Sequence, residues 1–183
     1  MRISLVIPTW NAGPLFQEVV DAVNALEGVV FAEKVAIDSG STDGTVEVAR
    51  GAGFEVVPIP QSEFDHGATR DRGIEKTTGD VIVLLVQDGT VQGSDWLEAM
   101  VAPVTDPDVA GVWCRQIPRP GCQPVLDRRI RGWPGRGEAV SKRQLEQGQK
   151  LSDLKPFDQL MHSAFDNVAS AVRRSVWQRF PLG

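Results

Sequence analysis

Short apolar runs alternate with apolar stripes of helical spacing along the first 114 residues. The runs at 2–7 (RISLVI), 34–37 (KVAI), 54–57 (FEVV) and 80–86 are typical of buried strands. Between them, apolar residues at helical spacing predict a helix that opens at Gly13-Pro14 and continues to Leu26. Further helices are predicted over 45–51, with Asp43 as N-cap, over about 67–77 and over 96–104, and a last strand is predicted at 109–114.

This alternation of strand and helix predicts an α/β domain built around a mostly parallel sheet. Ligands of such sheets bind beyond the carboxyl ends of the strands. Polar clusters follow three of the predicted strands, namely Pro8-Thr9-Trp10-Asn11, Asp38 and Gln87-Asp88. We therefore expect these three strand ends to meet at one crevice.

The pattern changes after residue 114. Prolines and glycines interrupt residues 115–160, where we expect a loop with short helices of the kind that is usually functional or mobile. Residues 164–172 predict a strand or a turn, which leads into a short helix at 173–180.

Length and composition fit a globular domain. The chain has 183 residues, enough for one domain with its own core, and 42% of them are hydrophobic and 23% charged. No apolar run approaches the roughly 20 residues that cross a bilayer, and the N-terminal segment lacks the features of a signal peptide. Cys114 and Cys122 form neither a disulfide framework nor a zinc motif. We expect a cytoplasmic protein.

Charge is unevenly distributed along the chain. Residues 115–143 contain eight Lys or Arg against two acidic residues, a balance of +6, whereas the remainder carries −11. Such a basic block indicates either an anionic partner, including a lipid surface contacted peripherally, or a solvated basic loop. Nucleic acid is not expected, because the block lacks the interleaved aromatic residues of a stacking platform apart from Trp133.

Several nucleotide and catalytic motifs are absent. The chain has no GxGxxG, no GxxxxGK[ST] and no GxSxG, and its two histidines cannot form a multi-histidine metal site. A Mg²⁺-like cation held by one carboxylate and substrate phosphates remains open. Asp88 could ligate such a cation or cap its turn, and Asp38 could accept a hydrogen bond from a nucleotide or hold its own turn.

Six segments together resemble the family 2 glycosyltransferases, which have the GT-A fold, and most closely the bacterial rhamnosyltransferase type. These segments, in chain order, are VIPTWN (6–11), IDSGSTDGT (37–45), FDHGATRDRG (64–73), GDVIVLLVQDG (79–89), RQIPRP (115–120) and FDNVASAVRRSVW (165–177). The resemblance covers nearly the whole chain and implies one GT-A-like domain over 1–183. Residues 1–114 would be its nucleotide-sugar-binding half and 115–183 its acceptor-side segment.

The resemblance also implies roles for single residues. Pro8, Thr9 and Asn11 would line the nucleotide pocket, and Asp38 would meet the base or ribose. Arg70 would lie near the phosphates. Asp88 would be the metal-binding acid, and Gln87 would take the central position in a QD variant of the DxD motif. Both would belong to the nucleotide-sugar-binding residues. Three further residues have no assigned role in the site. Asp80 is expected to be a structural cap, and His66 could be either a pocket residue or a residue at the start of a helix. Asp71 stands where relatives more often have Asn.

The implied reaction is inverting transfer from a nucleoside-diphosphate sugar, dTDP- or UDP-linked, assisted by Mg²⁺ or Mn²⁺. The acceptor would be a carbohydrate or a polyprenyl-linked molecule of surface polysaccharide synthesis. The acidic motif that supplies the general base in relatives would lie beyond Gly183, so no catalytic residue is assigned. The alternatives are a non-catalytic nucleotide-sugar-binding module and a nucleotidyltransferase of related fold.

Overall fold

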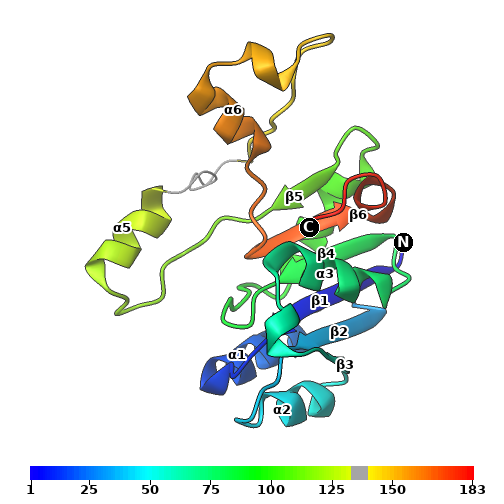
Figure 1. Cartoon of the computed structure of the whole chain (residues 1–183), viewed down its shortest axis with the longest axis vertical. Coiled ribbons are helices and arrows are strands. Elements are labelled where there is room, and N and C mark those ends of the chain that lie inside the picture. Colours follow the sequence, from blue (N-terminus) through cyan, green and yellow to red (C-terminus); the bar gives the residue numbers. More distant parts are fainter. Residues whose placement is uncertain (133–139) are drawn as a thin grey trace. The chain divides into compact units, whose positions relative to one another are not determined.

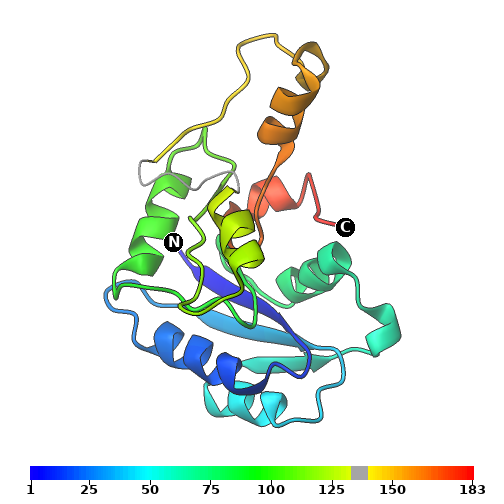
Figure 2. The ribbon, with the colours of Figure 1, turned by 90° about the vertical axis from the view of Figure 1, so that its left-hand side faces the viewer.

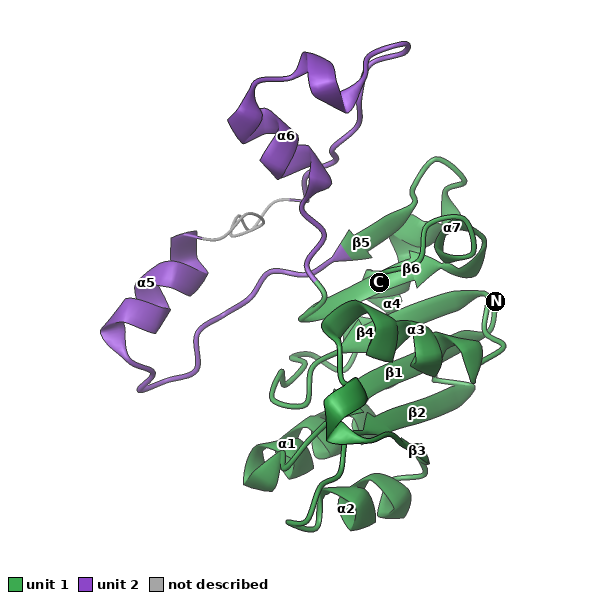
Figure 3. Ribbon diagram, viewed as in Figure 1, with its two compact units in different colours: residues 1–112, 167–183 green, residues 113–166 purple. Residues whose placement is uncertain are grey.

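The computed structural model describes residues 1–132 and 140–183. These residues form two compact units (Figure 3), one of residues 1–112 with 167–183 and one of residues 113–166. The returning segment 167–183, which the sequence analysis placed in the acceptor-side part, thus lies in the unit that carries the sheet.

A six-stranded sheet organises the first unit (Figure 1). Its strand order is β3-β2-β1-β4-β6-β5, and β1, β2, β3 and β4 run parallel. The strands are β1 (Ile3–Thr9), β2 (Glu33–Asp38), β3 (Glu55–Pro58), β4 (Val81–Leu85), β5 (Gly111–Trp113) and β6 (Ala169–Arg173). The expected mostly parallel α/β sheet is confirmed.

Burial explains why the central strands read as unbroken apolar runs. Every residue of β4 is buried, and β1 is buried throughout except at Pro8. Helices cover both faces of the sheet (Figures 1 and 2), with α3 on one face and α1 and α4 on the other. A strand covered on both sides needs apolar residues at successive positions, which is the pattern of VIVLL in β4.

The helices largely follow the predicted ranges. They are α1 (Gly13–Asn24), α2 (Thr45–Gly51), α3 (His66–Glu75), α4 (Trp96–Val101), α5 (Pro124–Gly132), α6 (Pro156–Ser163) and α7 (Arg174–Trp177), with short 3₁₀ turns η1 (Gln61–Glu63), η2 (Ala102–Thr105) and η3 (Leu151–Asp153). The helix expected over 96–104 gives way to η2 after Val101. Pro103 accounts for this, since it lacks the backbone N–H that would continue the α-helical hydrogen bonds.

The start of α2 corrects one expectation. Gly44, not Asp43, is the N-cap residue, and its φ of 92° is left-handed. Asp43 still contributes, because its carboxylate accepts hydrogen bonds from the Thr45 N–H (3.1 Å) and the Thr45 hydroxyl (2.6 Å). Asp43 therefore stabilises the helix start from one position earlier.

Strand β6 is the one departure from parallel order among the described pairings, because it runs antiparallel to β4. Of the segment 164–172, for which a strand or a turn was predicted, residues 169–172 belong to this strand, whereas 164–168 are not part of it. Arg173 and Arg174 fix its end. The Arg173 guanidinium donates to four backbone carbonyls of residues 104–109, and Arg174 donates to the Gly79 carbonyl at 2.6 Å.

The second unit contains α5, η3 and α6, as expected for an irregular stretch with short helices. Trp113 packs edge-on against Phe165 with ring centroids 5.7 Å apart, and the Arg143 guanidinium lies 5.2 Å from the centre of the Trp113 ring. Across the described part of the chain, no helix has the length and apolar character that a membrane span needs.

Candidate functional site

The ends of β1 and β2 are joined by side chains from the two loops that follow them. The Asn11 N–H donates to the Ser41 hydroxyl (2.9 Å), and the Asn11 carbonyl oxygen Oδ1 accepts from the Thr42 N–H (2.8 Å). Beside them, the Ala12 N–H donates to Thr45 and the Gly13 N–H to Asp43. Asn11 has a φ of 40°, a left-handed conformation that Asn tolerates better than most residues.

Asp38, the last residue of β2, is buried and holds its own loop. Its Oδ1 accepts from the N–H groups of Gly40 (3.0 Å) and Ser41 (2.9 Å), and its Oδ2 accepts from the hydroxyls of Thr9 (3.0 Å) and Ser41 (2.5 Å). A carboxylate has about four acceptor positions, and all four are used here. Of the two roles left open by the sequence, the structure shows turn stabilisation, and Thr9 shares in it.

Gln87 and Asp88 follow β4 and lie in a turn closed by the Gly89 N–H and the Val86 carbonyl. The Gln87 side chain turns back to Trp10 at the end of β1. The Trp10 N–H donates to Gln87 Oε1 (2.7 Å), and Gln87 Nε2 donates to the Trp10 carbonyl (3.2 Å). Asp88 is exposed, so its carboxylate has not lost its hydration to the apolar strand before it.

Helix α3 brings a cation to the same edge of the sheet. It lies on the β3-to-β4 crossover and runs opposite to the strands, so its N-terminus starts near their carboxyl ends. Asp65 caps it by accepting from the Gly67 (2.8 Å) and Ala68 (2.9 Å) N–H groups, and these bonds lower the pKa of the Asp65 carboxyl. His66 is exposed and contacts the Phe64 ring edge-on.

Arg70 is the least satisfied polar residue of this helix. Its side chain is buried, with only 6% of the residue exposed, and burial lowers the pKa of the guanidinium. One nitrogen donates to the His66 carbonyl (2.6 Å), whereas Nε has no hydrogen-bond partner among the described residues. A buried cation with an unused donor is costly unless an anion compensates it.

Asp71, next to Arg70 in α3, has a structural role that the sequence does not indicate. Its carboxylate accepts from Trp177 Nε1 (2.6 Å) and from the N–H groups of Leu182 (3.0 Å) and Gly183 (3.0 Å). Gly67 permits this approach, because a Cβ there would lie 2.3 Å from the Leu182 carbonyl oxygen. The sequence shows an acid at position 71 where relatives more often have Asn, but the partners of this acid become apparent only in the fold.

The remaining assignments have simple positions. Pro8 lies within β1, half-buried and opposite Ile37 of β2. Asp80 has the expected structural role, since its carboxylate accepts the Arg2 N–H at 2.7 Å. No cluster of three His, Cys, Asp or Glu side chains suited to a metal occurs in residues 1–132 and 140–183. A cation at Asp88 would therefore depend on oxygen ligands from a substrate.

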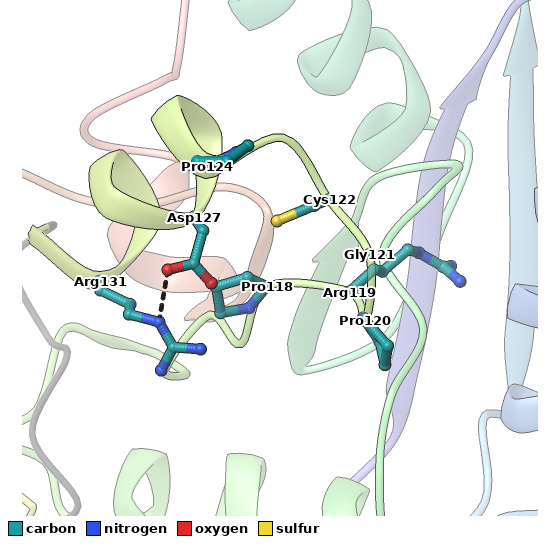
Figure 4. Close-up of a pocket in the computed structure, with 8 residues that line it drawn as sticks. All are labelled: Pro118, Arg119, Pro120, Gly121, Cys122, Pro124, Asp127 and Arg131. Atoms are coloured by element: carbon teal, nitrogen blue, oxygen red, sulfur yellow. Dashed lines mark hydrogen bonds and ion pairs between the residues drawn. The ribbon is translucent and has the colours of Figure 1, made fainter.

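The unit of residues 113–166 has a pocket of its own, of about 510 Å³ (Figure 4). Its eight lining residues are Pro118, Arg119, Pro120, Gly121, Cys122, Pro124, Asp127 and Arg131. Arg131 is paired with Asp127 at 2.7 Å, so part of the local positive charge is neutralised. All eight lining residues lie in the basic block of residues 115–143, and three of them belong to RQIPRP. Part of that block (133–139, including Trp133 and Arg136) is outside the described residues.

Comparisons with known proteins agree with this arrangement. Residues 4–170 match the family described as Glycosyl transferase family 2. The chain is 34% identical over 182 residues to the O-antigen chain rhamnosyltransferase RfbN of Salmonella typhimurium, covering 97% of this chain and 54% of the relative. It is 30% identical over 131 residues to the O-antigen chain rhamnosyltransferase WbaN of Salmonella anatum, covering 67% of this chain and 39% of that relative. The chain thus spans about half or less of the length of these relatives.

Solved structures share the fold. A mannosyltransferase from Pyrobaculum calidifontis, in complex with GDP-Man and Mn²⁺, superposes with a TM-score of 0.63 at 19% identity, over 97% of this chain and 46% of that one. Glucosyl-3-phosphoglycerate synthase from Mycobacterium tuberculosis, in complex with Mn²⁺, UDP and glucosyl-3-phosphoglycerate, superposes with a TM-score of 0.60 at 19% identity. The superposition covers 95% of this chain and 57% of that one.

Proposed function

Because the chain belongs to glycosyl transferase family 2, we propose that it carries the donor-binding part of an inverting glycosyltransferase that uses a nucleoside-diphosphate sugar. The names of the Salmonella relatives support a rhamnosyl donor and a role in surface polysaccharide synthesis. The nucleotide of this donor would be dTDP or UDP. The acceptor would be a carbohydrate or a polyprenyl-linked molecule.

The buried Arg70 guanidinium is the observation that carries this proposal. Its Nε donor has no partner among the described residues, and it lies on the helix that begins at the carboxyl edge of the sheet. A diphosphate bound there would supply both the missing acceptor and the compensating negative charge. Arg is suited to this task because its planar donors match phosphate oxygens.

Asp88 would bind a divalent cation together with the diphosphate. An exposed carboxylate on a turn after the central strand suits Mg²⁺ or Mn²⁺, which take carboxylate and phosphate oxygens. When bound, such an ion would act as a Lewis acid that neutralises charge on the leaving nucleoside diphosphate. Mn²⁺ is present in both solved structures described above, which supports the proposal for this chain.

The loops after β1 and β2 would form the nucleotide side of the site. Thr9 and Asp38 would support this side of the site from below, because their polar groups are hydrogen-bonded to each other and to the loop after β2. Asn11 and the exposed Trp10 would border the nucleotide, with Pro8 behind them. A contact from Asp38 to the base or ribose would require one of its four hydrogen bonds to be exchanged.

Thermal shifts with nucleoside diphosphates test the donor site. We expect dTDP or UDP to raise the Tm of the wild type further when Mn²⁺ is present, because a ligand that binds only the folded state stabilises it. Asp88→Asn should remove the Mn²⁺-dependent part of the shift and keep most of the Mn²⁺-independent part.

The matched control is Asp108→Asn, which removes one exposed charge at the opposite edge of the sheet, where Arg173 holds residues 104–109. It should behave like the wild type. A Mn²⁺-dependent shift that survives Asp88→Asn would contradict the role of Asp88. Donor turnover measured on the same samples distinguishes a transferase from the binding-only alternative.

Peripheral membrane contact through the basic block would complete the function of an enzyme with a lipid-linked acceptor. Within the described part of this block, α5 carries exposed Arg128 and Arg129 beside exposed Val125 and Leu126. A basic amphipathic helix of this kind is suited to an anionic lipid surface.

A further inference from the structure

The Gln87 side chain extends the connection between β1 and β4 beyond the point where their backbones separate. The backbone ladder of the two strands ends at the pair Val6 and Leu84. The ladder between β1 and β2 continues to Thr9 and Asp38. Past Leu84 the chain stays beside β6, as Leu85 pairs with Ala169 and the Val86 N–H donates to the Val168 carbonyl (3.0 Å). The end of β4 would therefore be free of β1 without a side-chain link.

The Gln87 amide provides that link in the manner of a backbone peptide. Its oxygen accepts the Trp10 N–H at 2.7 Å, and its nitrogen donates to the Trp10 carbonyl at 3.2 Å. The acceptor and the donor of the Gln87 amide are thus paired with the N–H and the carbonyl of the same residue, Trp10. This is the hydrogen-bonding pattern of a strand pair, and the side chain takes the place of the missing strand.

The link continues from Trp10 to the nucleotide side. The next residue, Asn11, is bonded through its backbone to Ser41 and through its side chain to Thr42. Ser41 in turn is held by Asp38. A continuous series of hydrogen bonds therefore joins the turn that carries Asp88 to the loop after β2.

We infer that Gln87 is a positioning residue that couples cation binding at Asp88 to nucleotide binding at the loops after β1 and β2. This inference rests on the proposed function. Gln87 acts through Trp10 and not by contacting the cation, since its amide is directed at the backbone. With the link in place, binding on one side holds the other in its binding geometry, so each ligand raises the affinity of the other by the same factor.

The chemistry of the link explains why glutamine is required at position 87. Glutamate has no N–H to give to the Trp10 carbonyl, and its charge would face that carbonyl oxygen. Asparagine has the amide but is one methylene shorter, so it cannot reach both Trp10 groups from the same backbone. Methionine has a similar length and makes neither strong hydrogen bond.

Two measurements test the inference, and the first needs no ligand. Hydrogen exchange of the Trp10 amide in the ligand-free chain should be faster in Gln87→Met than in the wild type by about fivefold or more, because its acceptor is gone. Amides in the middle of β1 should be unchanged, which shows that the variant is folded. An unchanged Trp10 exchange rate in Gln87→Met would overturn the inference and leave the proposed function intact.

The second measurement is the coupling factor itself. The Kd of Mn²⁺ is determined with and without saturating dTDP or UDP, and the ratio should be about tenfold or more in the wild type. It should fall by about threefold or more in Gln87→Met and Gln87→Asn but stay above one, because the diphosphate still ligates the cation directly, while the Kd of the nucleotide without metal changes by less than about threefold.

Gln87→Glu tests the link by adding a negative charge at position 87, and Gln92→Glu is its control, because it adds the same charge elsewhere in the loop. Gln92 is exposed, so its variant should keep the coupling factor, whereas Gln87→Glu should lower it. A wild-type coupling factor retained in Gln87→Met would overturn the inference. A wild type that binds neither nucleotide nor Mn²⁺ would overturn the proposed function and the coupling with it, whatever the exchange of Trp10 shows.

Discussion

The Asp71 carboxylate gathers three N–H groups that are more than 100 positions away along the chain. Trp177, Leu182 and Gly183 all donate to it, and they bring the last described segment against the first turns of α3. Hydrogen bonds to a charged group contribute about 1.5–3 kcal/mol each, more than neutral ones. A single carboxylate thereby fixes the position of residues 177–183 next to Arg70 and its helix.

Asp71→Asn should therefore destabilise the first unit even though it is nearly isosteric. The amide keeps one acceptor oxygen but places an N–H₂ group against a donor, so we expect a loss of about 1–3 kcal/mol in the free energy of unfolding by urea. Trp177→Phe removes a single donor and should cost less. Equal stability of Asp71→Asn and the wild type would show that the carboxylate is not needed as an acceptor.

Single-residue roles were predictable from the sequence where the local chain decides them. The position of Asp38 at a strand end was predicted. The structural role expected for Asp80 is confirmed, although its carboxylate accepts the N–H of Arg2, 78 positions away, and does not cap its own turn. Whether Asp38 holds its turn or meets a ligand depends on Thr9 and Ser41, whose side chains reach it only in the folded sheet. The Gln87 link to Trp10 joins residues 77 positions apart, and no local pattern indicates it.

At the scale of elements, a second polar network closes the opposite edge of the sheet. Glu33, at the start of β2, accepts from the hydroxyls of Ser4 (2.6 Å) and Thr78 (2.7 Å) and from the Thr78 N–H (2.8 Å). The Ser4 bond is the main reason that the pKa of the Glu33 carboxyl is lowered from 4.5 to about 2. The network ties β1, β2 and the loop before β4 at their amino ends.

This lowered pKa predicts how stability depends on pH. The folded state favours the charged form of Glu33, so its contribution is fully present above about pH 4.5 and is lost as the pH falls toward 2. The difference in unfolding free energy between wild type and Glu33→Gln should be constant from pH 7 to 5 and shrink below that. Glu55→Gln, exposed at the start of β3, serves as control and should show no such change.

Elements were predictable where apolar runs are long and buried on both faces, as in β1, β2 and β4. Strand β6 was less certain from sequence, because its five residues ASAVR contain no comparable run. Its antiparallel placement beside β4 results from a chain return that spans 54 residues of the second unit. Such a long-range pairing has no local signal.

At the scale of the whole molecule, the two units differ in charge. Residues 113–166 contain ten Lys or Arg and six Asp or Glu, a balance of +4, so the unit that carries the sheet has −9. An anionic surface would therefore attract the second unit and repel the first. Contact with lipid would be local to the second unit.

Vesicle binding checks this difference. Vesicles with anionic lipid should bind the wild type better than neutral vesicles, and the preference should fall with added salt because each basic residue near the surface contributes about 1 kcal/mol through a screened interaction. The double variant Arg128→Gln, Arg129→Gln should lose much of it. Arg50→Gln, Lys76→Gln removes the same charge from the first unit and should not. Equal binding to both kinds of vesicle would exclude the contact.

The second unit leaves the sheet at β5 and returns at β6, and these two strands are neighbours. It is therefore an insertion between adjacent strands, and the chain crosses between the units only at its two ends. A change in the sequence or length of such an insertion leaves the hydrogen bonds of the sheet in place. Under the proposed function, changes in the second unit could alter its contacts with the acceptor while the hydrogen bonds at the donor site stay as they are.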